Sequence, residues 1–343
     1  MTTALSTSTQ SALLDIAEQA DQAAAAHVFI DYRSRKAANT ITAQDGDLRT
    51  FAEFLNSVRG MPACDAADLG TSPACWQGLT WGIVEAYVKW MLLQGFAVGS
   101  VNRKLSTVKV YAKLATKAGT ISPDQYQLIK AVGGYGQKEA KRVNEHRSKT
   151  RMSPKKAEHV SISKDQAAML KSGRLGDTPQ AIRDDVLFCL LLDHGLRVGE
   201  VAGLRVEDVD ISAGTITFYR SKVDKTQTHE MTRDTLIAMR EYFDGGHAPA
   251  SGILLRGSLK SGELTDNRMS TRAITKRVRA VGEQLGIADN LSAHDCRHYW
   301  ATSANRGGTG LFDLQDAGGW NSPAMPARYV ESGKVANKNV VLG

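Results

Sequence analysis

Residues 184–200, DDVLFCLLLDHGLRVGE, are the stretch that decides the fold. The first ten are almost entirely apolar between two aspartate ends, and an apolar run of this length predicts a buried helix. The chain then leaves the helix near Gly195 and places Arg197 and Glu200 just beyond it. The stretch therefore predicts a core helix with two charged side chains held close to its end.

Residues 215–232, TITFYRSKVDKTQTHEMT, follow soon after. They hold two β-rich stretches on either side of Val223 and Asp224, which predicts a hairpin with Lys222 and Lys225 flanking its turn. The surrounding segments show helical patterns over residues 163–172, 267–285, 293–305 and 311–317. Residues 161–343 are therefore predicted to form a domain that is mainly α with a small antiparallel β-sheet.

The preceding part of the chain is also helical in pattern from residue 26 to 132. Leu48, Phe51 and Leu55 recur at three- and four-residue steps, and further helices are predicted over residues 81–93 and, from an N-cap at Ser100, over 100–118. Residues 1–25 are rich in Ser, Thr, Ala and Gln and are predicted to be a flexible arm. Residues 133–160 have no periodicity and are predicted to be an exposed linker between two domains.

The positive charge of the chain, +7 in all, is concentrated. Residues 130–156 contain nine Lys and Arg and two Glu, so that this segment carries the whole excess. Such a segment is either a solvated charge run or a strand of chain lying along a phosphate backbone. The same two interpretations apply to the cations of the helix over residues 100–118. The candidate DNA contacts from the two segments are Arg103, Lys104, Lys109, Lys113, Lys141 and Arg142.

Several classes of protein lack their usual signatures here. No run approaches the roughly 18–20 apolar residues of a membrane span, and the first thirty residues do not resemble a secretory signal. The four cysteines fit no zinc spacing and are expected to be reduced thiols in a cytosolic protein. No GxxxxGK[ST], GxGxxG or HExxH sequence is present, and HDCRH (294–298) lacks an evident third ligand, so no metal is expected.

What remains is a set of separated residues in a fixed order, and together they resemble the active site of the tyrosine recombinases, the lambda-integrase family. The set consists of Arg197, Lys222, His294, Arg297, Trp320 and Tyr329. The resemblance covers residues 161 to the C-terminus, and Trp320 stands where many members have a second histidine. It implies a two-domain clamp around DNA, built from a helical, SAM-like core-binding domain and a catalytic domain.

The resemblance also implies a role for each residue. Tyr329 would attack the phosphodiester, and the guanidinium groups of Arg197 and Arg297 would stabilise the charge that develops on the phosphate oxygens. His294 would assist proton transfer or bind a phosphate oxygen, and the indole N–H of Trp320 would bind the same phosphate. Lys222 is favoured as the acid that protonates the leaving oxygen, with Lys225 as the other candidate. Glu200 would orient Arg197, and His298 would pack rather than react.

The implied activity is site-specific DNA recombination, for integration, excision or resolution. It would proceed through a 3′-phosphotyrosyl intermediate and a Holliday junction, with no cofactor and no metal. The implied partner is double-stranded DNA with inverted-repeat sites, bound by a homotetramer that is monomeric off DNA, in a bacterial cytoplasm or nucleoid and encoded by a host, phage or mobile element. Two alternatives share these features: a type IB topoisomerase, and a catalytically inactive sequence-specific DNA-binding protein.

Overall fold

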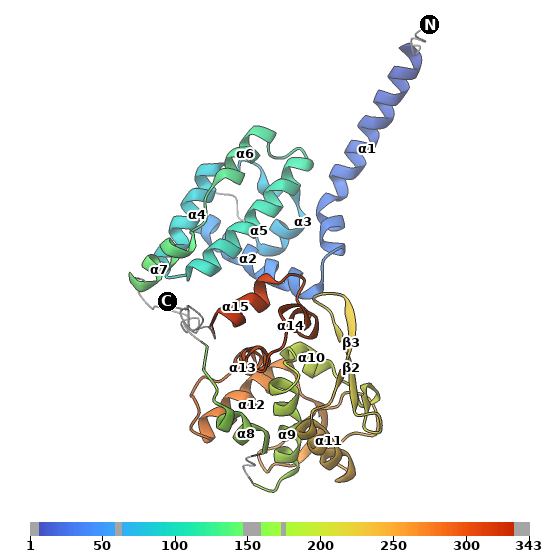
Figure 1. Cartoon of the computed structure of the whole chain (residues 1–343). Helices are drawn as coiled ribbons and strands as arrows, with labels where there is room; N and C mark the ends of the chain where they lie inside the picture. The colour runs from blue at the N-terminus through green and yellow to red at the C-terminus, as the bar shows by residue number, and fades with distance from the viewer. Residues whose placement is uncertain (1–6, 59–63, 147–158, 173–175, 333–343) are drawn as a thin grey trace, which may run out of the picture. The chain divides into compact units, whose positions relative to one another are not determined.

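The computed structural model describes residues 7–58, 64–146, 159–172 and 176–332 (Figure 1). The chain folds into two compact units, Met1–Ala157 and Glu158–Gly343. Most of the described residues are helical, and the strands form small antiparallel sheets in the second unit, so the predicted fold class is confirmed. Within the described ranges, no helix is long and apolar enough to cross a membrane.

The first unit is a helical bundle around an aromatic core. Its described helices are α1 (Thr7–Ser34), α2 (Ala38–Ser57), α3 (Ala66–Thr71), α4 (Trp81–Leu93), α5 (Val98–Lys117), α6 (Pro123–Ala131) and α7 (Gln137–His146). Phe51 lies between the rings of Trp76 and Tyr87, at 5.7 and 4.9 Å between centroids, and Trp76 stacks on Tyr111. These rings bury the shared faces of α2, α4 and α5.

Residues 7–25 of the predicted arm are helical and form the first part of α1. The segment AEQADQAAAA (17–26) consists largely of residues with high intrinsic helix propensity, which outweighs its polar composition. The side chains of residues 14–24 are nearly all exposed, and this half of α1 projects from the bundle (Figure 1).

Two further boundaries in this unit differ from prediction. Helix α5 begins at Val98 after Ala97, two residues before the predicted cap at Ser100. The predicted linker over 133–160 contains α7, in which the Glu139 carboxylate accepts the backbone N–H of Gly136 at 2.8 Å and fixes the first turn. Residues 147–158 of that linker lie outside the described part of the chain.

The second unit is built around α9 (Pro179–Leu192), the helix predicted from the opening stretch. Nearly every side chain of α9 is buried, and the helix packs against α8, α10, α11 and α13. The described helices of this unit, besides α9, are α8 (Lys164–Ser172), α10 (Val198–Gly203), α11 (Arg233–Asp244), α12 (Thr271–Gln284), α13 (Ala293–Arg306), α14 (Leu311–Gly318) and α15 (Ala324–Ser332). The helices α13, α14 and α15 pack on one another.

The strands of the second unit form two small sheets. Strands β1 (Val209–Asp210), β2 (Thr215–Arg220) and β3 (Lys225–Glu230) form one antiparallel sheet in that order, and β4 (Arg256–Ser258) pairs with β5 (Leu264–Arg268) in the other. The predicted hairpin is present, with Arg220 opposite Lys225 and Asp224 at a φ of +50° in the turn. The helix predicted from Asn267 instead starts at Thr271, because Asn267 and Arg268 lie in β5 and Ser270 caps the helix.

Candidate active site

Arg197 and Glu200 lie at the start of α10, directly after the core helix α9. Glu200 is the third residue of α10, and its carboxylate accepts the backbone N–H of Arg197 at 2.8 Å, which satisfies one of the unpaired donors at the helix start. The other carboxylate oxygen pairs with Nη1 of the Arg197 side chain, also at 2.8 Å. The two side chains therefore form a salt bridge, which holds a partly exposed guanidinium against a nearly buried carboxylate.

Arg297 projects from the second turn of α13. The start of this helix is fixed by a capping box, because Asp295 accepts the backbone N–H of Ser292 at 2.8 Å and the Ser292 hydroxyl accepts that of Asp295. The Arg297 side chain is only 4% exposed and donates to the carbonyl oxygens of Gly195 and Gly318. It thus links the loop before Arg197 to the end of α14.

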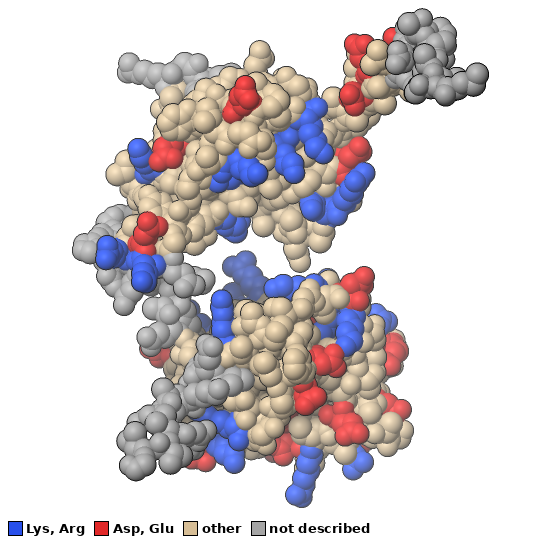
Figure 2. All heavy atoms as spheres, turned by 45° about the horizontal axis from the view of Figure 1, so that its top comes forward, with Lys and Arg blue, Asp and Glu red and all other residues tan. Residues whose placement is uncertain are grey.

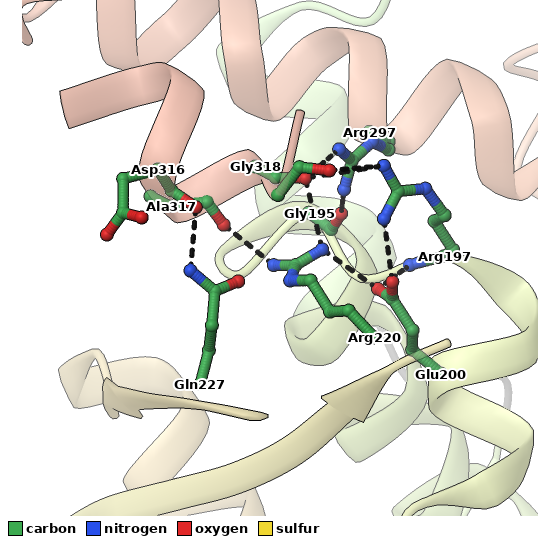
Figure 3. A network of polar contacts seen from close by, with 10 residues as sticks. Gly195, Arg197, Glu200, Arg220, Gln227, Arg297, Asp316, Ala317 and Gly318 are labelled. Carbon is green, nitrogen blue, oxygen red and sulfur yellow. Dashed lines mark hydrogen bonds and ion pairs between the residues drawn. The ribbon is translucent and has the colours of Figure 1, made fainter. Parts of the chain in front are cut away.

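A third guanidinium, which the sequence analysis did not single out, completes this group. Arg220 is the last residue of β2 and is fully buried. Its Nη1 pairs with Glu200 at 3.0 Å and donates to the Gly318 carbonyl at 3.1 Å, and its Nη2 donates to the Ala317 carbonyl at 2.7 Å (Figure 3). The alternation of strand β2 was the available signal, since Ile216, Phe218 and Arg220 share its buried face.

Trp320 follows a tight turn at the end of α14, and two glycines allow that turn. Gly319 has a φ of +58°, and a Cβ there would lie 2.4 Å from Cδ of Arg220. A Cβ on Gly318 would lie 1.9 Å from the indole ring of Trp320. The turn places the indole ring against the guanidinium of Arg297, whose Cζ lies 4.4 Å from the ring centroid. The backbone also contributes, since Arg197 Nη2 donates to the Gly319 carbonyl at 2.9 Å.

Tyr329 lies in α15 against this group and is 4% exposed. Its ring centroid is 5.6 Å from that of Trp320 and 4.8 Å from that of His298, which meets it edge-on. Burial raises the pKa of Tyr329, while the positive charges of Arg297 and Arg197 act in the opposite direction. His298 also stacks on His159, with 3.6 Å between the ring centroids.

The remaining predicted residues lie at the edge of the group. His294 is exposed in the first turn of α13, one turn before Arg297 and His298. Lys222 is exposed in the turn between β2 and β3. Lys225 begins β3 and forms an ion pair with Asp316, in which both side chains are more than half exposed. The hairpin thus carries both candidate acids two residues or more beyond Arg220.

The predicted DNA contacts of the first unit differ in their burial and in their bonds to other residues. The prediction is wrong for Lys104, which is 6% exposed, pairs with Asp47 at 3.3 Å and donates to the Thr50 hydroxyl. Arg103 is half exposed and pairs with the same aspartate. Lys109 donates to two carbonyl oxygens at the end of α6, at Lys130 and Val132.

The other three predicted contacts lie on α5 and α7. Lys113 and Arg142 are exposed, and the side chain of Lys141 lies outside the described part of the structure. Figure 2 shows Lys and Arg side chains grouped on one side of the first unit. Exposed cations of this kind can meet phosphates, whereas the buried Lys104 stabilises the bundle.

The chemistry of the site follows from its charge. The guanidinium groups of Arg197 and Arg220 pair with one carboxylate, that of Glu200. The third, on Arg297, donates only to the backbone carbonyls of Gly195 and Gly318 among the bonds drawn in Figure 3. Burial and the two neighbouring guanidiniums lower the pKa of Arg297 to about 9, which leaves it charged at neutral pH. A partly buried site with excess positive charge and fixed N–H donors is suited to bind an anion and to stabilise further negative charge on it. In the described ranges, no group of three His, Cys, Asp or Glu side chains gathers as metal ligands would.

Comparison with known proteins supports this interpretation. The model of the phage integrase family matches residues 162–335. The tyrosine recombinase XerC of Halalkalibacterium halodurans is 24% identical over 297 residues, which cover 84% of this chain and 85% of the relative. The tyrosine recombinase XerC of Pelobacter propionicus is 23% identical over 315 residues, which cover 90% of each chain.

Solved structures share the fold over most of the chain. The integrase of transposon Tn1549, in complex with transposon right-end DNA, superposes with a TM-score of 0.61 at 14% identity, over 89% of this chain and 94% of that one. A lambda integrase dimer bound to a core site gives a TM-score of 0.59 at 13% identity, over 92% of this chain and 98% of that one. At these identities the likeness shows a common fold.

Proposed function

We propose a residue-by-residue mechanism from the premise that this chain belongs to the phage integrase family of tyrosine recombinases. The chain is accordingly an enzyme of site-specific recombination, which cleaves and rejoins DNA through a covalent tyrosine intermediate. The family does not by itself say which side chains act. The observation that carries our assignment is the convergence of Arg197, Arg297 and Trp320 beside Tyr329.

Tyr329 is the proposed nucleophile. Its phenol oxygen attacks the phosphorus of the scissile phosphodiester and forms a 3′-phosphotyrosyl bond, while the bond to the 5′-oxygen of the next nucleotide breaks. The phenol must lose its proton in this step, and burial opposes that loss by raising its pKa. The positive charges of Arg297 and Arg197 favour the phenolate, and His294 is proposed to help remove the proton or to bind a phosphate oxygen.

Arg197 and Arg297 are proposed to bind the two non-bridging oxygens of the phosphate. Each guanidinium presents several N–H donors in a rigid fork, and the oxygens carry more negative charge in the five-coordinate transition state than in the ground state. Glu200 keeps Arg197 oriented through two hydrogen bonds. The indole N–H of Trp320, whose ring packs on the guanidinium of Arg297, is proposed to bind the same phosphate.

Lys222 is proposed to protonate the departing 5′-oxygen, which becomes a free hydroxyl. The alternative acid, Lys225, forms an ion pair with Asp316 of α14, whereas Lys222 forms none with the described residues. Rejoining reverses these steps: a 5′-hydroxyl attacks the phosphotyrosyl bond, returns its proton, and releases Tyr329. No external energy source is required, because the phosphotyrosyl bond conserves the energy of the broken phosphodiester.

The assembly and the partner DNA are also proposals. A lambda integrase structure among the similar folds is a tetramer bound to a Holliday junction, and others contain integrases bound to DNA. We propose that this chain likewise binds double-stranded DNA with inverted repeats and acts there as a homotetramer, monomeric off DNA. The cytoplasm of a bacterium is the proposed location, since the XerC relatives are bacterial proteins.

A finer resemblance concerns the end of α14. The sequence AGGW (317–320), with a tryptophan in place of the common second histidine, resembles Cre recombinase. The two relatives described above, which match over most of the chain, are instead named XerC. We propose that the Cre-like character is confined to this turn, where the indole of Trp320 packs on Arg297.

A single experiment tests the mechanism and identifies the target sequence at the same time. The protein is mixed with fragmented DNA of its source organism and denatured, and the DNA covalently bound to it is recovered and sequenced, with Tyr329→Phe treated in parallel. We expect adducts with the unaltered chain alone, clustered at one inverted-repeat sequence. Adducts formed equally by Tyr329→Phe would contradict the assignment of the nucleophile.

The same experiment separates the alternatives. Tyrosine-dependent adducts scattered over all sequences would indicate a type IB topoisomerase, and binding without any adduct would indicate a DNA-binding protein that lacks the chemistry. Arg197→Lys serves as a second test, because a lysine keeps the charge and lacks the fork. We expect adduct formation to fall about 100-fold, the usual loss when one transition-state donor is removed.

A further inference from the structure

Arg220 is a buried cation that the proposed mechanism does not use. Its side chain has no exposed surface, and its guanidinium lies 4.8 Å from the ring centroid of Phe218. Burial lowers the pKa of Arg220, and the negative charge of Glu200 opposes that effect. A buried charge is costly unless it is paired and hydrogen-bonded, so the groups that pair with Arg220 determine what it can do.

The contacts of Arg220 join two parts of the active site that are far apart in the sequence. On one side, its Nη1 pairs with the carboxylate of Glu200, the same group that holds the backbone and the side chain of Arg197. On the other side, it donates to the carbonyl oxygens of Ala317 and Gly318 in the turn before Trp320 (Figure 3). The position of Arg220 therefore affects both Arg197 and Trp320.

The Gly318 carbonyl shows how tightly these groups are coupled. It accepts hydrogen bonds from Arg220 at 3.1 Å, from Arg197 at 3.5 Å and from Arg297. Strand β3 supports the same turn, since Gln227 donates to the carbonyl of Asp316 at 2.7 Å. The β2–β3 hairpin, whose turn contains Lys222, is thereby hydrogen-bonded to the turn that precedes Trp320.

We propose that Arg220 is a positioning residue for strand cleavage: it holds Glu200 and the 317–318 carbonyls so that Arg197, Trp320 and Lys222 converge on one phosphate. The inference rests on the proposed function, because it assumes that these three side chains act on the phosphate. Arg220 itself is fully buried behind them and acts through them.

The test uses the full chain and the DNA site recovered by adduct sequencing. Arg220→Met keeps the apolar stem and removes the charge and the donors, and Arg220→Lys keeps the charge but can reach fewer of the acceptors. The measured quantities are the rate of adduct formation at saturating protein and the affinity for the site. We expect Arg220→Met to lose about 100-fold in rate, as for a transition-state donor, with affinity nearly unchanged.

Arg183→Met is the matched control, because Arg183 is equally buried in the same unit but lies outside the site. It pairs with Asp184 at 2.7 Å and donates to the Arg256 carbonyl. Both variants lose a buried ion pair and are expected to be less stable, so rates are expressed per folded molecule, determined by circular dichroism at the assay temperature. We expect the folded fraction of Arg183→Met to cleave at the unaltered rate. If Arg220→Met does not fold, Arg220→Lys carries the comparison.

A second substrate separates positioning from a general structural effect. In a methylphosphonate linkage one non-bridging oxygen is replaced by a methyl group, so less charge needs stabilisation by Arg197. We expect the deficit of the Arg220 variants to shrink at least tenfold on this substrate. The inference would be overturned if the Arg220 variants lost the same factor in rate on both substrates. It would also be overturned if Arg220→Met cleaved the ordinary phosphodiester within threefold of the rate of the unaltered chain. Absence of Tyr329-dependent adducts from the unaltered chain would instead overturn the proposed function.

Discussion

Replacement of Gly319 by alanine tests the close approach between α14 and β2. The glycine has a φ of +58°, and a Cβ there would lie 2.4 Å from Cδ and 2.9 Å from Nε of Arg220. The left-handed backbone alone costs an alanine about 1–2 kcal/mol. Displacement of a packed, buried side chain adds about 1–3 kcal/mol. We therefore expect Gly319→Ala to lower the free energy of unfolding of the second unit by about 2–5 kcal/mol.

Gly214→Ala is the matched control in the same unit. Gly214 has a φ of +67°, and nothing lies within 4 Å of a Cβ built on it, so only the backbone penalty applies. For a unit of this size each kcal/mol shifts Tm by about 2–4 °C. Gly319→Ala should consequently melt about 2–12 °C below Gly214→Ala in thermal unfolding followed by circular dichroism. Equal Tm values for the two variants would refute the argument that Arg220 fills the space beside Gly319.

Three further outcomes can be measured on the same protein. Lys104→Met should lower the free energy of unfolding of the first unit by about 1.5–3 kcal/mol, because the buried Asp47 loses one of its two described cations and keeps Arg103 and the Thr107 hydroxyl. Lys113→Met should instead weaken DNA binding and leave stability unchanged. The reverse pattern in urea titrations and binding assays would restore Lys104 as a DNA contact. Burial lowers the pKa of His194 to about 3, so this residue stays neutral in the folded state while the unfolded chain takes up a proton below about pH 6.5. Stability should thus fall as the pH drops below 6.5, by up to about 1.4 kcal/mol per pH unit from this residue, and His194→Gln should flatten that slope; an unchanged slope would show that another group is responsible. DNA affinity should decrease by roughly 0.9 log units per contacted phosphate for each tenfold rise in salt, and a flat response would contradict binding through the basic segment.

The core helix and the hairpin of the second unit could be predicted from local pattern. Apolar length identified α9, and the two β-rich stretches around Val223 and Asp224 identified β2 and β3. A helix and a hairpin are formed by residues close together in the chain, so the sequence of each segment is enough to predict it. The long helix α1 was missed because its polar composition was given more weight than the helix propensity of its alanine-rich segment.

The candidate site was predictable in its residues but not in its connections. Arg197 and Glu200 are three residues apart, and helix geometry predicts their contact. Arg220 bonds to a carbonyl 98 residues away, and that partner is a backbone atom with no signature in the sequence. Alternation along β2 could have shown that Arg220 is buried, and a buried arginine must be paired, but its partners require the fold.

In the first unit, Lys104 is another buried cation whose partner could not be predicted from the sequence. It lies three residues after Val101 and four before Val108, both fully buried, so helical periodicity places it on the core face of α5. The sequence analysis instead counted it among the candidate DNA contacts, and a buried lysine is rare. Asp47, which makes that burial possible, lies on α2, and its carboxylate also accepts the Thr107 hydroxyl at 2.8 Å.

Every residue of the network in Figure 3 belongs to the second unit, from Gly195 to Gly318. The first unit contributes none of the labelled side chains, although it carries its own buried charge cluster around Asp47. Substitutions in the helices before residue 158 consequently remove none of the side chains or carbonyls that form this network. For protein engineering, the boundary after Ala157 is the point at which the first unit can be exchanged without removing a residue of the network in Figure 3.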